Sequence, residues 1–505
     1  MTQARRMRTA LALAAGSCVL VGWLWPAAAD ELAAKSRPPT PSRFRPVARH
    51  KQALRAIYKQ LVDIDTSSSK GTTRAAQAMA ARFRAAGFPA ADVRVLVHPK
   101  NPTRGNLVVR MRGRGARKPL LLLAHIDVVD ARRADWSPGL DPFALTERDG
   151  YFYGRGAVDD KAMAAIFTAN LLRYKEEGYR PDRDLILALT ADEEGGDWNG
   201  VEWLLREHRA LVDAELGLNE GGGGGYRQGR RLFNAVQASE KVYQSFALEV
   251  TNRGGHSSRP IKDNAIYRLA AALDRLSKHV FPVSLNDVTR TFFRRAAATE
   301  RGQIAADMRA IATGSANPAA AARLSAMPSY NAMMRTTCVA TQLEGGHAEN
   351  ALPQRARAVV NCRILPHERV EDIERALARV IADREVHISR IKEPKPSPPS
   401  PLTPAVMKPI EAITESMWPG VPVIPVMSTG ATDGLYFRKA GIPIYGVSGL
   451  FGDIDDVRAH GRDERLLANS LWEGQEFLYR LVKVLSGGET REVRGRAADQ
   501  ASGLN

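Results

Sequence analysis

The stretch Leu120-Leu-Leu-Leu-Ala-His125-Ile-Asp127 is an apolar run that carries no charge until it reaches a histidine and a carboxylate. Such a run is typical of a buried parallel strand, and open α/β sheets bind ligands at the carboxyl ends of their strands. Because side chains alternate along an extended chain, His125 and Asp127 share a face and Ile126 points away. One of these two side chains can hold a metal ion while the other orients the ligand. For this segment alone, the alternative is a structural histidine whose hydrogen bonds are made within the protein.

Further candidate ligands follow other apolar runs and a glycine-rich turn. Asp159 closes Gly154-Arg-Gly-Ala-Val-Asp159 and precedes a predicted helix, where capping the helix is its alternative role. A predicted strand at 185–190 leads to the adjacent Glu193 and Glu194, and a shorter one at 216–219 leads to Glu220. The pattern predicts that these side chains meet at one edge of a sheet.

The donor set predicts the kind of metal. Imidazoles and carboxylates without a thiolate suit borderline divalent ions, zinc first, with cobalt or manganese as alternatives. Five protein ligands are too many for one catalytic ion but serve two ions when one carboxylate bridges them. We therefore expect two Zn²⁺ per chain in a two-metal hydrolase. The candidate ligands are His125, Asp159, Glu194, Glu220 and His460.

The domain organisation follows from the element pattern. With 505 residues, 44% of them hydrophobic, the chain can form more than one domain. Buried strands and helices over 47–240 and again over 401–486 predict an α/β catalytic domain, with a mostly parallel sheet and helices on both faces. Between them, 241–400 begins with antiparallel alternation and predicts an inserted α+β, ferredoxin-like lid. Within it, an Ala/Arg-rich stretch at 282–328 is expected to add helices and shape the substrate pocket. A final helix is expected over 462–485.

The first 29 residues have the form of an export signal. Arg5, Arg6 and Arg8 precede the apolar run 9–25, and small residues lead to Ala29. We expect cleavage after Ala29 and a periplasmic or secreted protein without a stable membrane anchor; an uncleaved anchor is the alternative, for which the run is short. The Sec and twin-arginine routes both stay open. A linker is expected over 30–46, and a disordered tail over 487–505.

Charge and cysteines narrow the class of protein. The formal charge is +17, or +14 without the three signal arginines, but the arginines are scattered and no nucleic-acid motif occurs. A solvated basic surface is the better interpretation, so no nucleic-acid partner is expected. Cys338 and Cys362 face each other in a predicted hairpin that turns near Asn350, and whether they pair is left open.

Taken in order, the motifs resemble those of M20-family metallopeptidases, the group of carboxypeptidase G, aminoacylase-1, carnosinase and carboxypeptidase S. The resemblance spans about 53–484, and it is specific because the segments occur together and in order. They are His125-Ile-Asp127, Gly154-Arg-Gly-Ala-Val-Asp159-Asp160-Lys161, Asp192-Glu193-Glu194-Gly195-Gly196, Asn219-Glu220-Gly221, Gly254-Gly255-His256-Ser257, Gly430-Ala-Thr432-Asp433 and His460.

The resemblance implies a role for each matching residue. His125 and Glu220 would hold one ion, Glu194 and His460 the other, and Asp159 would bridge them through a segment with a cis peptide to Asp160. Glu193 would be the general base of a metal-activated water, and Asp127 the partner of His125. The residues implied to contact the substrate or the oxyanion are His256, Asn350, Arg363 and the Ser448-Gly449 turn.

The sequence thus predicts an exported hydrolase that cleaves an amide bond next to a free carboxylate, as a carboxypeptidase or N-acyl-amino-acid amidohydrolase does. Its partners would be a small peptide or N-acyl amino acid and a second copy of the chain, bound through the lid. An aminopeptidase or dipeptidase on the same scaffold is the first alternative. A non-catalytic peptide-binding protein is the second, and the complete residue set argues against it.

Overall fold

The computed structural model describes residues 38–40, 42, 44, 46–314 and 317–487. The expected signal segment, most of the expected linker and the tail beyond Gly487 lie outside the described residues. Within the described ranges, no helix combines the length and the apolar composition that are needed to cross a bilayer.

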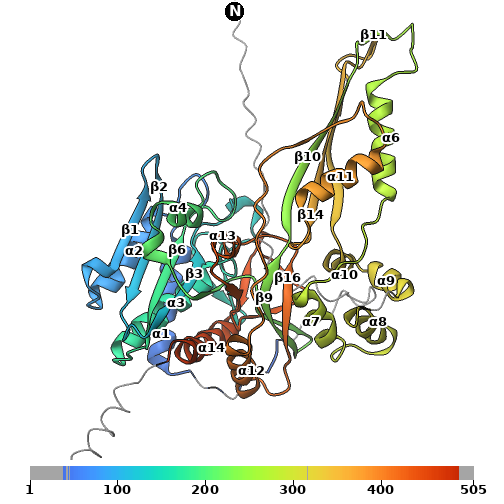
Figure 1. Ribbon diagram of the computed structural model, residues 1–505. Coiled ribbons are helices and arrows are strands. Elements are labelled where there is room, and N and C mark those ends of the chain that lie inside the picture. The colour runs from blue at the N-terminus through green and yellow to red at the C-terminus, as the bar shows by residue number, and fades with distance from the viewer. Residues whose placement is uncertain (1–37, 41, 43, 45, 315–316, 488–505) are drawn as a thin grey trace, which may run out of the picture.

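A ten-stranded sheet forms the larger part of the molecule (Figure 1). Its centre is parallel: β3 pairs with β6 and β7, and β7 pairs with β17. The strands in spatial order are β1 (Val93–His98), β2 (Asn101–Met111), β6 (Arg183–Thr190), β3 (Arg117–His125), β7 (Leu216–Asn219), β17 (Ile444–Gly446), β9 (Arg230–Glu240), β8 (Gly224–Arg227) and β18 (Phe451–Asp453), with β16 (Val423–Ser428) paired to β9.

Both faces of this sheet are covered because successive residues of β3 point in opposite directions. Leu120 and Leu122 pack into one core with helices on their side, whereas Leu121 and Leu123 pack into a second core on the other side. The first face carries α1 (Ala48–Asp63), α2 (Thr73–Ala85), α3 (Lys161–Glu176), α12 (Pro404–Met417) and α14 (Ala468–Ser486); the second carries α4 (Gly200–Glu207), α5 (Arg209–Val212) and α13 (Gly434–Lys439). The predicted fold class is confirmed.

The inserted lid is a separate antiparallel sheet with its own core, and it extends away from the large sheet (Figure 1). Its order, β12-β14-β10-β15 with two helices, is the expected ferredoxin-like pattern. Cys338 and Cys362 lie opposite each other in the β12–β14 register and form a disulfide. The elements are β10 (Val242–Thr251), α6 (Ala265–Lys278), β12 (Thr337–Gly345), β14 (Arg355–Ile364), α11 (Val370–Ile381) and β15 (His387–Arg390), with β11 (Gly255–His256) and β13 (Ala351–Leu352) paired at the far end.

The stretch 282–328 adds helices, as expected, but they pack elsewhere than on the lid sheet. Phe292 and Phe293 share a core with Phe233 of β9 and Val426 of β16, so the helices brace one end of the large sheet. They do not line the cavity beside the metal ligands that is described below. These helices are α7 (Asp287–Ala296), α8 (Gly302–Ala312), α9 (Pro318–Ser325) and α10 (Pro328–Met334).

The expected start of the last helix was wrong. The residues Arg465–Leu467 form β19, which pairs with β5, and α14 begins only at Ala468. Together with β4 (Thr146–Arg148) and β5 (Tyr151–Tyr153), this strand makes a small three-stranded sheet. Two short 3-10 turns, Ala90–Asp92 and Arg133–Asp135, complete the described elements.

Candidate metal centre

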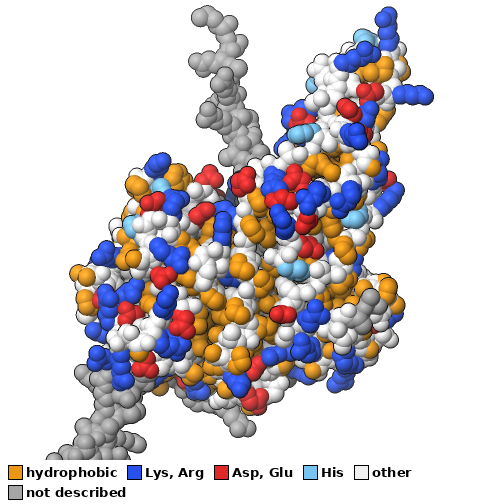
Figure 2. Space-filling view, in the orientation of Figure 1, with side chains coloured by type: hydrophobic (Ala, Val, Ile, Leu, Met, Phe, Trp, Pro, Cys, Tyr) orange, Lys and Arg blue, Asp and Glu red, His pale blue; other side chains and the backbone are white. Residues whose placement is uncertain are grey.

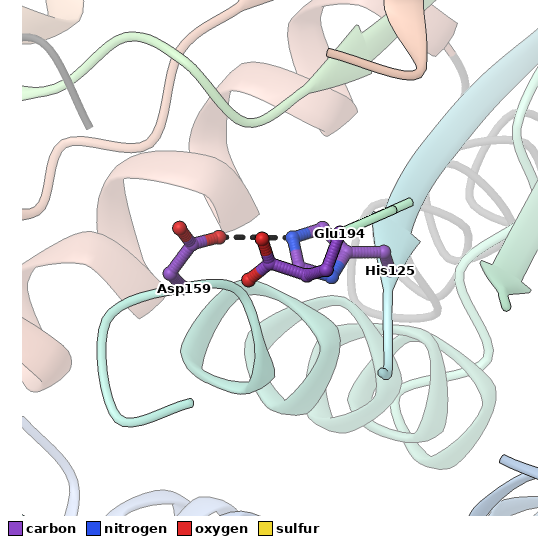
Figure 3. A group of neighbouring side chains, drawn as sticks. All are labelled: His125, Asp159 and Glu194. Carbon is purple, nitrogen blue, oxygen red and sulfur yellow. Dashed lines mark hydrogen bonds and ion pairs between the residues drawn. The ribbon is translucent and has the colours of Figure 1, made fainter. Parts of the chain in front are cut away.

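His125 stands at the end of β3 with its two ring nitrogens in different surroundings. Nδ1 lies 3.1 Å from the backbone oxygen and 3.6 Å from Oδ1 of Asp127. Nε2 faces the other way, 2.9 Å from Oδ1 of Asp159 and 3.9 Å from Oε1 of Glu220. Figure 3 shows Asp159 and Glu194 beside the ring. The strand therefore presents one nitrogen to the carboxylates while Asp127 holds the opposite side of the ring.

Asp127 also fixes the turn that carries the two glutamates. Its carboxylate accepts hydrogen bonds from the backbone N–H of Glu193, at 3.2 Å, and of Glu194, at 3.0 Å. One residue thus orients the histidine and the acidic turn from a neighbouring strand. This explains why Asp127 has to follow His125 at a spacing of two.

Asp159 lies between the two histidines. Its Oδ1 is 2.9 Å from Nε2 of His125, and its Oδ2 is 3.1 Å from Nε2 of His460. His460 is also 2.9 Å from Oε2 of Glu194. The peptide from Asp159 to Asp160 is cis, as the resemblance implied. A carboxylate with one oxygen towards each imidazole has the arrangement that a bridging ligand requires.

The remaining acidic groups complete two overlapping clusters. His125, Asp159 and Glu194 offer ligand atoms within 4.8 Å of one another, and so do His125, Glu193 and Glu220. Oε1 of Glu220 is buried and accepts no hydrogen bond from the described residues. Buried carboxylates need compensating positive charge. The residues present therefore fit a pair of divalent cations.

The electrostatics of the cluster agree with this interpretation. Burial, followed by the charge of Asp159, raises the pKa of Glu194 to about 7. Burial and then the neighbouring Glu220 raise the pKa of Glu193 well above its ordinary value. Burial would also raise the pKa of Asp159, but hydrogen bonds from His125 and His460 hold it below its usual range. Crowded carboxylates with such opposed shifts are common at functional sites.

A buried ion pair that was not predicted joins the loops of two ligands. Nη1 of Arg155 lies 2.6 Å from Oε2 of Glu464, and Nη2 donates to the backbone oxygen of His460 at 3.1 Å. Glu464 in turn accepts from the backbone N–H of Val158 and of Asp159. The pair therefore holds the Asp159 and His460 loops together. The available signal was their position, since Arg155 lies inside the glycine-rich motif and Glu464 follows His460 by four residues.

The substrate-contacting residues implied on the lid do not gather in one place. Arg363 lies at the base of β14, where its Nη1 donates to the backbone oxygen of Thr429 and its guanidinium sits 4.6 Å over the ring of Tyr243. His256 and Asn350 instead lie at the far end, on or beside β11 and β13 (Figure 1). There Nδ1 of His256 accepts from the backbone N–H of Ser258 at 3.1 Å.

The Ser448-Gly449 turn lies next to the glycine-rich segment that follows Glu220. The hydroxyl of Ser448 donates to the backbone oxygen of Gly222 at 2.8 Å, so this side chain ties the turn to that segment. Gly449 has a φ of 66°, and an added Cβ would meet the ring of Phe477 at 2.7 Å. Glycine is required at this position by both its backbone conformation and the lack of space.

Parallel strands that bring His125 and carboxylates to one edge of the sheet, together with a loop carboxylate that lies between His125 and His460, define a metal-dependent hydrolase. The chain belongs to the peptidase family M20/M25/M40, whose family model matches residues 121–484. The resemblance drawn from the motifs is confirmed.

Individual relatives agree with this assignment. The chain is 30% identical over 375 residues to N-fatty-acyl-amino acid synthase/hydrolase PM20D1 of Xenopus tropicalis, covering 72% of each chain. It is 29% identical over 389 residues to probable carboxypeptidase S-like 2 of Dictyostelium discoideum, covering 72% of this chain and 71% of the relative. The crystal structure of an M20 family metallo-carboxypeptidase from Sulfolobus solfataricus shares the fold, with a TM-score of 0.64 at 17% identity over 86% of this chain and 99% of that one.

Proposed function

We propose that this protein is an exported two-zinc amidohydrolase that cleaves the amide bond of N-acyl amino acids or small peptides with a free carboxylate. The position of Asp159 between His125 and His460 carries the proposal, because it suits a bridge between two cations. His125 and Glu220 would hold one cation, and Glu194 and His460 the other. Relatives named for carboxypeptidase and N-acyl-amino-acid activities support the substrate class.

The mechanism assigns steps to residues of the chain itself. Cations bound in this centre would supply the Lewis acidity that lowers the pKa of a water and polarises the amide carbonyl. Glu193 takes the proton of the attacking water and delivers it to the departing amine nitrogen. Its burial beside Glu220 favours the protonated form and so suits the second of these steps. Arg363 pairs with the free carboxylate of the substrate through its planar fork.

The first test is hydrolysis of a panel of N-acyl amino acids, their carboxamides and amino-terminal reporter peptides by the purified protein. We expect two divalent ions per chain, turnover of the free acids only, loss of turnover with a chelator and recovery with Zn²⁺. Full activity in metal-free protein would refute the metal assignment. Preference for the reporter peptides would instead identify an aminopeptidase, and turnover of free dipeptides alone a dipeptidase.

Arg363→Ala is expected to lower kcat/KM for free-acid substrates by roughly 10- to 100-fold, because a charge-assisted contact is lost. Substrates that are already amidated should lose far less. Arg357→Ala provides the matched control, since Arg357 lies on the same face of β14 but farther along the lid. Equal losses on acids and amides would remove Arg363 from carboxylate recognition.

Export and dimerisation complete the proposal. A mature chain that begins at Asp30, as measured by mass spectrometry of the native protein, tests export; a retained Met1 would contradict it. The Cys338–Cys362 disulfide is of the kind that persists in oxidising compartments and supports this expectation.

For dimerisation, β12 is an edge strand of the lid sheet, and its Val339 and Leu343 are 61% and 67% exposed. An open edge with exposed apolar side chains suits pairing with a second lid.

A further inference from the structure

A cavity of about 100 Å³ adjoins the metal centre. Glu220 and Asp160 form part of its wall, so it reaches the ligand cluster. The rest of the wall comes from four directions: the glycine run after Glu220, helix α3, the loop 450–459 that leads to His460, and strands β5 and β19 of the small sheet. Any group that occupies this cavity therefore lies directly beside the place where the scissile amide would be held.

The glycine run fixes the position of one wall of the cavity. An added Cβ at Gly223 would meet the backbone oxygen of Leu450 at 2.8 Å, and one at Gly224 would meet the ring of Phe451 at 2.2 Å. Only glycines let the chain after Glu220 lie so close to this loop. The loop is thereby fixed against β8 and forms one side of the cavity.

The side chains that face the cavity are mainly apolar. They include Val158, Met163, Leu450, Ile454, Leu466 and Leu467. Both arginines on the same wall are already paired: Oδ1 of Asp456 lies 2.6 Å from Nε of Arg458, and its Oδ2 lies 2.5 Å from Nη2 of Arg465. The other charged groups of the wall, Asp160, Glu220 and Asp453, are carboxylates. The wall thus offers contact surface to a hydrocarbon, whereas a carboxylate would have to compete for arginines that are already engaged.

We propose that this cavity binds the aliphatic acyl chain of an N-acyl amino acid, with the acyl carbonyl at the metal centre. This inference rests on the proposed function, and it adds that the enzyme selects its substrate by the acyl chain. A mainly apolar cavity that begins beside Glu220 and Asp160 suits a hydrocarbon chain that continues from the carbonyl. Each methylene that enters such a cavity raises the binding constant about fourfold.

The test uses N-acylglycines from acetyl to dodecanoyl, because glycine contributes no side chain of its own. For the parent enzyme, kcat/KM is expected to rise by about fourfold per methylene until the cavity is filled. Val457 lines the cavity and is 42% exposed, so Val457→Trp narrows it with little effect on folding. In this variant the gain per methylene should disappear, so that the loss relative to the parent grows with chain length. Val484→Trp is the control, since Val484 is 57% exposed on α14 and lies away from the cavity.

A binding measurement separates this proposal from the proposed function. The zinc-loaded Glu193→Gln protein is titrated with N-dodecanoylglycine and with N-acetylglycine by calorimetry, with and without Val457→Trp. Tighter binding of the dodecanoyl compound that is lost with Val457→Trp supports the cavity, even if no N-acylglycine is turned over and the proposed function fails. Equal chain-length dependence in the parent and in Val457→Trp overturns the cavity proposal, even if N-acylglycines are hydrolysed. Altered preference among amino-acid side chains at constant acyl group would overturn it as well.

Discussion

Glu193→Gln is expected to lower kcat by about 10²- to 10⁴-fold, the range that general acid–base catalysis contributes, while two divalent ions stay bound. The replacement keeps the shape of the side chain and removes its ability to carry a proton. The backbone of residue 193 should stay in place, because its N–H is held by Asp127. The other carboxylates of the centre remain available as ligands. Steady-state kinetics and metal analysis on the same preparation measure both effects.

The control for this experiment is Glu207→Gln, which makes the same chemical change at an exposed position near the end of α4. It should leave both turnover and metal content at parent values. If Glu193→Gln keeps turnover within about tenfold of the parent, Glu193 is not the proton carrier. If it loses metal together with turnover, Glu193 acts as a ligand.

His256→Ala is expected to be nearly inactive, yet to recover activity when it is mixed with Glu193→Gln under conditions of subunit exchange. His256 is exposed at the far end of the lid and remote from the ligand cluster of its own chain (Figure 1). A dimer through the lids would bring it to the metal centre of the partner, where it would stabilise the oxyanion. Each heterodimer then contains one site with both Glu193 and His256 intact.

The surface around His256 suits such a role. Arg253, Arg259 and Lys262 are exposed and lie within six residues of His256 in the chain, and Figure 2 shows basic side chains gathered over this end of the lid. A basic tip would be attracted to the acidic centre of the partner. His387→Ala, which changes an exposed histidine of the β15 edge, is the control and should retain activity alone. A mixture that exchanges subunits and stays inactive, or a fully active monomer, would refute action across the interface.

Much of the metal centre could be predicted from the sequence, because several of its ligands directly follow strands that can be recognised from the local pattern of apolar residues. His125, Glu194 and Glu220 each follow an apolar strand, and strands of one parallel sheet end at the same edge. The position of Asp159 between two histidines could not be read in this way, since it depends on how loops from both ends of the chain pack. The pairing of Arg155 with Glu464 was not predicted for the same reason.

Two other features were decided by packing rather than by pattern. The segment Arg465–Leu467 continues a helical periodicity, but it pairs with the edge of β5 and forms β19. Helix α14 therefore begins only at Ala468. The helices over 287–334 carry no signal for their docking site, which is set by Phe292 and Phe293 against the large sheet. Propensity places such elements in the sequence, whereas tertiary contacts decide where they end and what they touch.

Arg155 and Glu464 are 309 residues apart in the chain, and so the two loops that they join are made at very different times. At ordinary rates of synthesis, roughly 15 to 60 seconds separate the appearance of Asp159 from that of its partner loop. During this interval the nascent chain has His125 and Asp159 but neither His460 nor the carboxylate that receives the N–H groups of the Asp159 loop. The complete centre therefore forms only when the last part of the chain folds back onto the first, and a chain that crosses a membrane unfolded would have to collect its cations on the far side.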